Sequence, residues 1–144
     1  TNDAPSSITR LINIGIEPFL VAGAVNAVLA QRLMRCVCAH CGEDHAVSEE
    51  TAAILAGYGL TQSTLREGTG CDKCRQTGMS GRLGIYEMLQ IDDTLRDRIA
   101  GNPSVNELRK HCCESGMKTL RQDAIEKMVE GRTTLSEVLR VTTE

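Results

Sequence analysis

The stretches CVCAHC, residues 36–41, and CDKC, residues 71–74, contain five of the seven cysteines of this 144-residue chain. Their two C-x-x-C pairs are Cys38 with Cys41 and Cys71 with Cys74. Two residues between cysteines let both thiolates face one ion, and two such pairs supply four ligands in a tetrahedron. Four protein ligands leave no position open for water or substrate, so the spacing predicts a structural metal site.

Other uses of these four cysteines were weighed against zinc. A disulfide framework is typical of secreted chains and fits an odd number of cysteines poorly. A thioredoxin-like redox motif needs one C-x-x-C near a βαβ pattern, whereas this chain has two pairs and no such pattern. Iron or an iron–sulfur cluster could use the same four sulfurs. The paired spacing favours zinc, and the identity of the metal is left to measurement.

Other cysteine and histidine residues are not expected to bind the ion. Cys36, His40 and His45 lie near the site, and we interpret them as packing or loop residues. Cys112 and Cys113 are adjacent on a predicted helix, where side chains point about 100° apart, so they are unsuited to bind one ion together. We expect Cys112 in the core.

Composition excludes several classes of protein. The net charge is −3 with both signs interspersed, which gives no basic face for nucleic acid. Aromatic residues make up 2% of the chain, so the core must be aliphatic. The longest apolar run, residues 19–30, is shorter than the ~20 residues of a membrane span, and we expect no transmembrane segment. The first residue is not Met, and we expect the chain to be part of a longer protein.

Periodicity and capping signals predict a mixed, mostly helical chain. We expect helices over 6–15, 18–35 and 48–57. The second should be buried and should run to about Arg35, because apolar residues surround most of its circumference. Asp92 and three capping boxes predict four more helices after residue 92; the boxes are Ser104 with Glu107, Thr119 with Gln122, and Thr134 with Glu137.

One strand is predicted, over residues 82–91, and its pairing partner is expected to be short or to lie outside this chain. Residues 36–47 and 61–81 are expected to form loops. GMSGRLG, residues 78–84, has no Lys where a phosphate-binding loop needs one, so it predicts a turn. The chain contains no G-x-x-x-x-G-K-[ST] motif and no complete active site.

Several long stretches of the sequence resemble the ATPases of type II secretion and type IV pilus assembly, which form one family. They are TNDAPSSITRLINIGIEPFL (1–20), LAQRLMRCVCAHC (29–41), CDKCRQTGMSGRLGIYEML (71–89) and GMKTLRQDAIEKMVEGRTTLSEVLRVT (116–142). The resemblance covers the whole chain and implies an α+β, mostly helical fold. It implies the C-terminal end of a RecA-like P-loop NTPase core at 1–35, a four-cysteine zinc-binding subdomain at 36–81, and a strand plus a C-terminal helical subdomain at 82–144.

The resemblance also implies which residues touch the nucleotide. Thr1, Asn2 and Asp3 match the end of the family's His box, whose His is not in this sequence, and the Walker A, Asp box and Walker B motifs would precede it. The chain alone should therefore not hydrolyse ATP, although its parent should, with ATP and Mg²⁺. Residues expected to reach nucleotide or a neighbouring subunit are Arg10, Gln31 and Arg32; Arg35 is interpreted as a helix-end and surface residue.

The resemblance further implies a cytoplasmic homohexamer, peripheral at the bacterial inner membrane, that works with platform proteins of the secretion system. Zinc at Cys38, Cys41, Cys71 and Cys74 would be structural. The stretch GIEPFL (15–20) and the ending LRVTTE (139–144) resemble type II secretion more than pilus assembly, and retraction ATPases, which generally lack the cysteines, are disfavoured. A stand-alone zinc-ribbon module that binds proteins is the alternative from another class.

Overall fold

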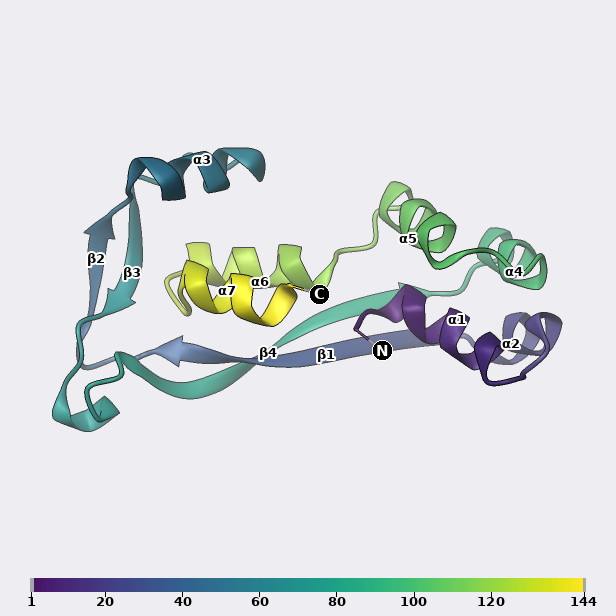
Figure 1. Cartoon of the computed structure of the whole chain (residues 1–144), viewed down its shortest axis with the longest axis horizontal. Coiled ribbons are helices and arrows are strands. Elements are labelled where there is room, and N and C mark those ends of the chain that lie inside the picture. Colours follow the sequence, from purple (N-terminus) through teal and green to yellow (C-terminus); the bar gives the residue numbers. More distant parts are fainter. Residues whose placement is uncertain (1, 144) are drawn as a thin grey trace. The chain divides into compact units, whose positions relative to one another are not determined.

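The computed structural model describes residues 2–143 and divides them into two compact units. Unit 1 comprises residues 2–32 and 86–123, and unit 2 comprises residues 33–85 and 124–143. Two long strands, β1 (Ala27–Val37) and β4 (Met79–Gln90), pair with each other and contribute residues to both units (Figure 1). The mixed α+β class predicted from the sequence is confirmed.

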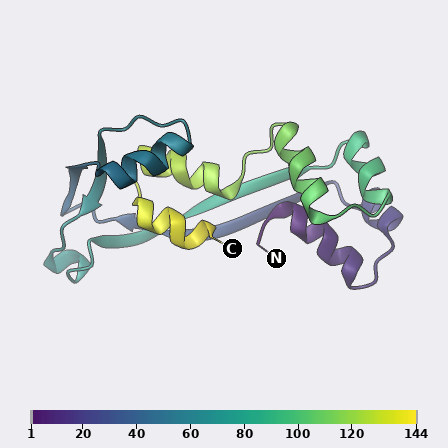
Figure 2. The same ribbon diagram turned by 45° about the horizontal axis from the view of Figure 1, so that its top comes forward.

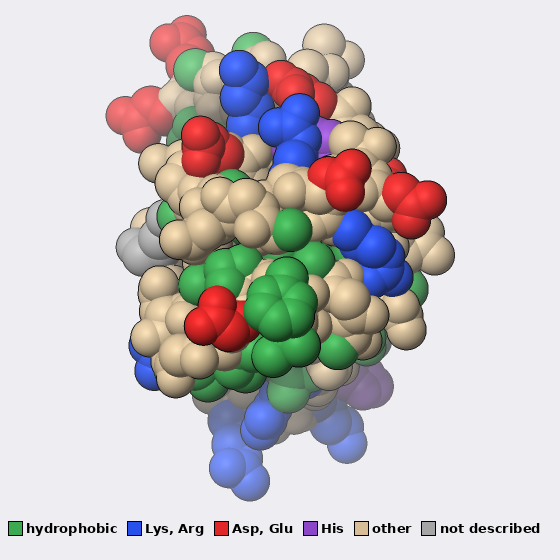
Figure 3. Space-filling view, turned by 90° about the vertical axis from the view of Figure 1, so that its right-hand side faces the viewer, with side chains coloured by type: hydrophobic (Ala, Val, Ile, Leu, Met, Phe, Trp, Pro, Cys, Tyr) green, Lys and Arg blue, Asp and Glu red, His purple; other side chains and the backbone are tan. Residues whose placement is uncertain are grey.

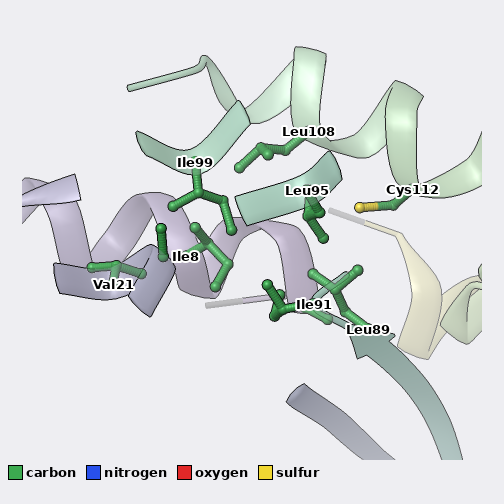
Figure 4. Close-up of a cluster of buried hydrophobic side chains, with 10 residues drawn as sticks. Ile8, Val21, Leu89, Ile91, Leu95, Ile99, Leu108 and Cys112 are labelled. Carbon is green, nitrogen blue, oxygen red and sulfur yellow. The ribbon is translucent and has the colours of Figure 1, made fainter. Parts of the chain in front are cut away.

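Unit 1 gathers four helices at one end of the β1–β4 ribbon: α1 (Ala4–Asn13), α2 (Pro18–Ala24), α4 (Asp93–Ala100) and α5 (Val105–Glu114). Figures 1 and 2 agree on this arrangement. Buried side chains of these helices, together with Leu89 of β4 and Ile91 just after it, form one mostly aliphatic cluster, drawn in Figure 4: Ala4, Ile8, Val21, Ala22, Leu89, Ile91, Leu95, Ile99, Leu108 and Cys112. The prediction that Cys112 packs in the core is confirmed.

The helix starts in unit 1 follow the capping signals of the sequence. The Asp92 carboxylate accepts the Leu95 N–H at 2.7 Å, and Ser104 with Glu107 forms a full capping box at α5. The start of α1 differs from the predicted range of 6–15, because Asp3 is its N-cap and the helix begins at Ala4. Arg96 on α4 donates to the backbone carbonyls of Ala22 and Val25 and so ties α4 to the C-terminal end of α2.

The predicted long helix over residues 18–35 is wrong. The chain forms the short helix α2, which ends at Ala24, and then enters β1 at Ala27. Gly23 and Asn26 weaken a helix here, while the β-branched Val25 and Val28 favour a strand that can pair with β4.

The same segment was expected to be buried, and within this chain it is buried only in part, at Val21, Ala22 and Met34. The side chains of Phe19 and Leu29 are each 62% exposed, and Leu20 is 52% exposed. Ile14 and Ile16, in the connection between α1 and α2, are 62% and 38% exposed. Figure 3 faces the end of unit 1 that carries α2 and α4, and hydrophobic side chains gather there in one area.

The strand predicted over residues 82–91 is confirmed as β4, but the expectation about its partner is wrong, because β1 of the same chain pairs with it. The predicted loops also contain strands. β2 (Gly42–Ala46) pairs antiparallel with β3 (Thr64–Gly68), with Gly42 opposite Gly68 and Ala46 opposite Thr64. Four of the five residues of β2 are exposed, so the alternation that reveals a strand in a sequence is missing.

Unit 2 consists of an arm and a helical part. The arm is formed by β2, β3 and, between them, α3 (Glu49–Gly57), which Ser48 caps as predicted (Figure 1). The helical part contains residues 124–129 of α6 (Leu120–Val129) and all of α7 (Leu135–Thr142), which lie side by side in Figures 1 and 2. The three-segment division at 35 and 81 stays a prediction. No helix within residues 2–143 combines the length and the apolar character that a membrane span requires.

Candidate metal centre

The four cysteines of the C-x-x-C pairs lie where four strands of the chain end or begin. Cys38 directly follows β1, and Cys41 directly precedes β2. Cys71 follows β3, and Cys74 ends a short 3₁₀ turn, η1 (Asp72–Cys74), that leads into β4. The chain therefore enters the arm after the first cysteine pair and leaves it before the second, and the sulfurs of residues 33 positions apart come together.

The four sulfur atoms form a compact cage. The Sγ atoms of Cys71 and Cys74 are 3.7 Å apart, those of Cys41 and Cys74 are 3.8 Å apart, and those of Cys38 and Cys71 are 3.9 Å apart. All four atoms lie within 4.8 Å of one another. A zinc ion at ~2.3 Å from four thiolates requires sulfurs about 3.8 Å apart at the corners of a tetrahedron. The spacing fits the ion without rearrangement of the backbone.

Burial separates the four ligands into three enclosed sulfurs and one nearer the surface. Cys38, Cys41 and Cys74 are 0%, 8% and 6% exposed, and Cys71 is partly buried beside them. All seven cysteines fall within the described residues, and all are free thiols. The S–S separations are far longer than the ~2.05 Å of a disulfide bond.

Backbone hydrogen bonds hold the two cysteine pairs together. The Cys38 N–H donates to the Gly78 carbonyl at 2.9 Å, and the Thr69 N–H donates to the Cys41 carbonyl at 3.2 Å. Gly68 and Gly78 approach so closely that a Cβ on either would collide with the backbone of the other. These contacts fix the loop positions before any ion is considered.

Backbone donors also point at the sulfur of Cys74. The N–H groups of Cys71 and Gly78 each lie 3.2 Å from this Sγ. Burial alone would raise the pKa of Cys74, but these two N–H donors and the thiols of Cys71 and Cys41 lower it to about 6. Burial, together with the neighbouring thiols, raises the pKa of Cys41 to about 11. The lowered pKa favours the thiolate form of Cys74 beside the three other thiols. A divalent cation that binds the four sulfurs would displace the protons of the other three.

The remaining cysteine and histidine residues near the cage are not part of it. Cys36 lies on β1, at the end of the segment that was predicted to be a helix over 18–35, while His40 and His45 are exposed. Within the described residues, the group able to hold a metal consists of Cys38, Cys41, Cys71 and Cys74. Such a closed set of ligands can crosslink the chain, but it offers no position for a substrate.

The residues expected near nucleotide all fall in unit 1. Thr1 lies outside the described residues. Arg32 donates to the backbone carbonyl of Asn2 at 3.3 Å, and Arg10 lines a cavity of about 240 Å³ together with Asn2. The other lining residues of this cavity are Ser6, Thr9, Asn13 and Arg109. The structure thus brings Asn2, Arg10 and Arg32 into one neighbourhood, and their contact with nucleotide or another subunit stays a prediction.

The positions and contacts of Gln31 and Asp3 limit the ligands that these two residues could bind. Gln31 is exposed on β1 next to Arg32, and successive residues of a strand face opposite sides, so the two side chains do not serve one ligand directly. Asp3 caps α1 by accepting the Ser6 N–H at 2.8 Å and forms an ion pair with Arg109 at 2.6 Å. Burial would raise the pKa of Asp3, but its hydrogen bonds to Ser6 and Arg109 and the positive charge of Arg109 lower it.

Two buried glutamates were missed by the sequence analysis. Glu87 on β4 is 3% exposed and accepts backbone N–H groups of Ala4 and Leu120. Glu137 is 1% exposed and binds the guanidinium groups of Arg35 and Arg140.

The predicted capping boxes at these helices have different outcomes. The box of Thr119 with Gln122 is present, with both of its hydrogen bonds formed. Thr134 accepts the Glu137 N–H at 3.3 Å, but the Glu137 carboxylate binds the two arginines, so the reciprocal half of that box is wrong. Arg35 is consequently an ion-pair residue of unit 2 rather than a helix-end residue.

The sequence was compared with families and with proteins of known identity. The family model described as type II/IV secretion system protein matches residues 1–140. The chain is 43% identical over 144 residues to type II secretion system protein E of Pseudomonas aeruginosa, a match that covers 100% of this chain and 28% of that protein. It is 42% identical over 149 residues to the type IV pilus assembly ATPase PilB of Thermus thermophilus, covering 100% of this chain and 16% of that protein.

A further relative is type II secretion system ATPase E of Vibrio cholerae, which is 38% identical over 144 residues. That match covers 100% of this chain and 28% of the relative. The chain therefore spans less than a third of the length of these relatives.

Proposed function

The chain belongs to the type II/IV secretion system protein family, and from this premise we propose that it is part of the ATP-hydrolysing motor of a type II secretion system. The observation that carries the proposal is the 43% identity, along the whole chain, with type II secretion system protein E. The motor activity belongs to the longer protein, because the phosphate-binding loop of a P-loop ATPase is not in this sequence.

Within this proposal, unit 1 supplies the end of a RecA-like ATPase core. Asn2 and Asp3 would complete a His box, and Arg10, Gln31 or Arg32 would contact nucleotide or the adjacent subunit of a homohexamer. The exposed side chains of Phe19, Leu20 and Leu29 support the idea that other parts of the longer protein cover this surface, since monomers rarely expose large apolar areas. We place the assembly in the cytoplasm, peripheral at the inner membrane and in contact with platform proteins.

Zinc is the ion that the four-cysteine cage fits, and Cys38, Cys41, Cys71 and Cys74 would hold it. When bound, the ion supplies a crosslink among four thiolates and takes no part in ATP hydrolysis. The arm formed by β2, α3 and β3 is attached to the rest of unit 2 through the two cysteine pairs. A rigid attachment would let the arm transmit movement of the motor or dock a platform protein.

Type IV pilus assembly is the second candidate, and a specific observation favours it. The identity with the pilus ATPase of Thermus thermophilus, 42%, is almost the same as that with the secretion protein. A gene deletion distinguishes the two functions. Loss of the longer protein should abolish protein secretion if it is a type II secretion motor, and pilus extension if it is a pilus assembly motor. A stand-alone zinc-ribbon module instead predicts a soluble monomer whose apolar surface needs no further chain.

The proposal is tested first by elemental analysis of the purified chain. About one zinc per chain, without visible absorbance, supports the structural cage, whereas iron with visible bands would demand an electron-transfer function.

The role of the arm is tested with the variant Cys38→Ser/Cys71→Ser in the full-length protein. Loss of secretion in a variant that still folds and hydrolyses ATP supports transmission through the arm. Normal secretion by the same variant would exclude it.

A further inference from the structure

The inward side of β4 contains one charged residue among apolar ones. Leu83, Ile85, Glu87 and Leu89 alternate along the strand and are all buried. Glu87 is 3% exposed, in a row where an aliphatic side chain is the ordinary choice. A carboxylate is stable there only if its oxygens are hydrogen-bonded, so its partners reveal why it is present.

Both oxygens of Glu87 bind helix N-termini. Oε1 accepts the N–H of Ala4 at 2.7 Å, and Oε2 accepts the N–H of Leu120 at 3.1 Å. Ala4 is the first residue of α1 and Leu120 is the first residue of α6. The first N–H groups of a helix have no partner within the helix, and the positive end of the helix dipole favours an anion. One carboxylate thus joins two helix starts that lie 83 and 33 residues from it in the sequence.

Further bonds hold each of these two helix starts in place. At α1, Asp3 forms its ion pair with Arg109 of α5 at 2.6 Å, and Arg32 of β1 donates to the carbonyl of Asn2. At α6, the Asp123 carboxylate accepts the N–H of Tyr86, the residue before Glu87, at 2.9 Å. Residues 86 and 87 of β4 therefore anchor the first turn of α6, and Glu87 connects that anchor to the segment Asn2–Asp3.

We propose that Glu87 is a positioning residue that couples the segment Asn2–Asp3 to the start of α6. A displacement of Asn2–Asp3 would pull on the carboxylate through Ala4 and reach Leu120 through its second oxygen. Helix α6 begins in unit 1 and continues into unit 2, the unit that carries the cysteine cage. The coupling rests on the proposed function in one respect, because ATP-driven displacement of Asn2–Asp3 requires that this segment completes the His box of an ATPase.

The alternative is that Glu87 only fills space and satisfies the core. Burying a charge is a weak means of stabilisation, since apolar residues of similar volume often stabilise as well or better. An apolar side chain could not accept hydrogen bonds from the two helix starts. The two carboxylate oxygens of Glu87 do so, and they hold the starts of α1 and α6 at a fixed separation. A structural role and a positioning role differ in which measurement they affect.

The first test measures backbone amide exchange of the 144-residue chain, with and without the substitution Glu87→Gln. The Gln amide has one acceptor oxygen and one NH₂ donor, so it does not accept from both helices. We expect exchange at the starts of α1 and α6 to accelerate about tenfold or more, with exchange at Leu95 and Ile99 in the α4 core unchanged. Glu87→Asp keeps the charge but shortens the reach, and should also accelerate exchange at one or both starts.

Glu137→Gln is the matched control, because it removes the charge of an equally buried glutamate in unit 2. It should leave exchange at Ala4 and Leu120 unchanged. Unchanged exchange at both helix starts in Glu87→Gln would overturn the proposal. Uniform acceleration across all of unit 1 would also overturn it, because it would indicate general destabilisation.

The second test uses the full-length protein and ATP. We expect Glu87→Gln to lower kcat about tenfold while the KM for ATP stays within about twofold, and Glu137→Gln to leave kcat unchanged. An unaltered kcat in Glu87→Gln, in a protein whose wild type is active, would overturn the coupling to catalysis. A wild-type protein that does not hydrolyse ATP would instead refute the proposed function, and the exchange experiment would still decide whether Glu87 couples the two helix starts.

Discussion

Unit 1 and the arm of unit 2 are stabilised in different ways. Unit 1 buries ten mostly aliphatic side chains from α1, α2, β4, α4 and α5 in one cluster. At the base of the arm, the buried cluster consists of Cys38, Cys41 and Cys74 with Cys71 against it, and the arm itself adds Leu55 and Leu65 as buried apolar residues. Two strands of five residues and one helix are too small to bury a core of their own. We therefore expect the arm to depend on the crosslink that a bound metal would supply, whereas unit 1 depends on apolar surface removed from water.

Removal of the metal should separate the two regions most clearly. Structural zinc sites contribute on the order of 10 kcal/mol to the folding of small domains, so a strong chelator should unfold the arm. We expect amide protection in β2 and β3 to be lost while protection in α1 and α4 is retained, measured by hydrogen exchange before and after chelation. The variant Cys71→Ser should reproduce the effect, and Cys113→Ser, which changes an exposed thiol outside the cage, is the control. Equal loss of protection in both units would show that they share one source of stability.

A substitution that creates a cavity in the core of unit 1 should destabilise unit 1 and leave the arm and its metal unaffected. Ile99 is 0% exposed, and Ile99→Ala removes buried methyl groups, so we expect about 2–5 kcal/mol of destabilisation in unit 1. The metal content should not change. Ile14→Ala alters a side chain that is 62% exposed and should shift the free energy of unfolding by less than about 0.5 kcal/mol. Loss of metal from Ile99→Ala, measured by elemental analysis, would contradict the independence of the two regions.

In both regions, the features that the sequence predicted correctly have local signals. The C-x-x-C spacing identified the four cage residues, and capping signals at Asp92, Ser104 and Thr119 identified the starts of α4, α5 and α6. The resemblance to secretion and pilus ATPases is confirmed by the matching family and relatives. These signals are local: a few neighbouring residues determine each of them.

The features that the sequence did not predict depend on contacts with residues that lie far away in the chain. The apolar run at 19–30 fits a helix or a strand, and β4, some 55 residues later, decides in favour of β1. Four of the five residues of β2 are exposed and only Leu65 of β3 is buried, so the two strands are specified by each other rather than by alternation. The sequence does not show that Glu87 and Glu137 are buried, because partners of each lie far away: Ala4 and Leu120 are 83 and 33 residues from Glu87, and Arg35 is 102 residues from Glu137.

Backbone geometry around the cage gives a third, smaller test. Gly78 has a φ of +73°, and a Cβ there would collide with the backbone of Gly68, so Gly78→Ala should destabilise the arm by about 3 kcal/mol and weaken metal binding. Gly81 has a φ of +78° but open space around its Cβ position, so Gly81→Ala should show only the left-handed backbone penalty of about 1–2 kcal/mol. Competition with a zinc indicator would measure the difference. Equal metal affinity in the two variants would mean that the close approach of Gly68 and Gly78 is unimportant for the cage.

The ion pairs of Glu137 should give unit 2 a stronger dependence on acid than the carboxylates of unit 1 give that unit. Hydrogen bonds from Arg140, and then from Arg35, lower the pKa of Glu137 to about 2 even though burial opposes the shift. A carboxylate whose folded pKa lies below its unfolded value of about 4.5 stabilises the protein above pH 4.5, and this contribution is lost as the pH falls toward 2. Because Arg35 and Arg140 are 53% and 56% exposed, solvent screening limits the contribution to about 2 kcal/mol.

Urea unfolding between pH 2 and pH 7 should therefore show wild type more stable than Glu137→Gln at neutral pH, with the difference closing as the solution is acidified. Glu107→Gln changes an exposed capping carboxylate of unit 1, whose pKa is lowered by its hydrogen bonds to Ser104, and serves as the comparison. Its effect should be smaller and confined to unit 1. A difference between wild type and Glu137→Gln that is the same at pH 2 and pH 7 would assign the stabilisation to packing of the side chain rather than to its charge. Unit 2 would then depend on close packing around α7 in the same way that unit 1 depends on its aliphatic cluster.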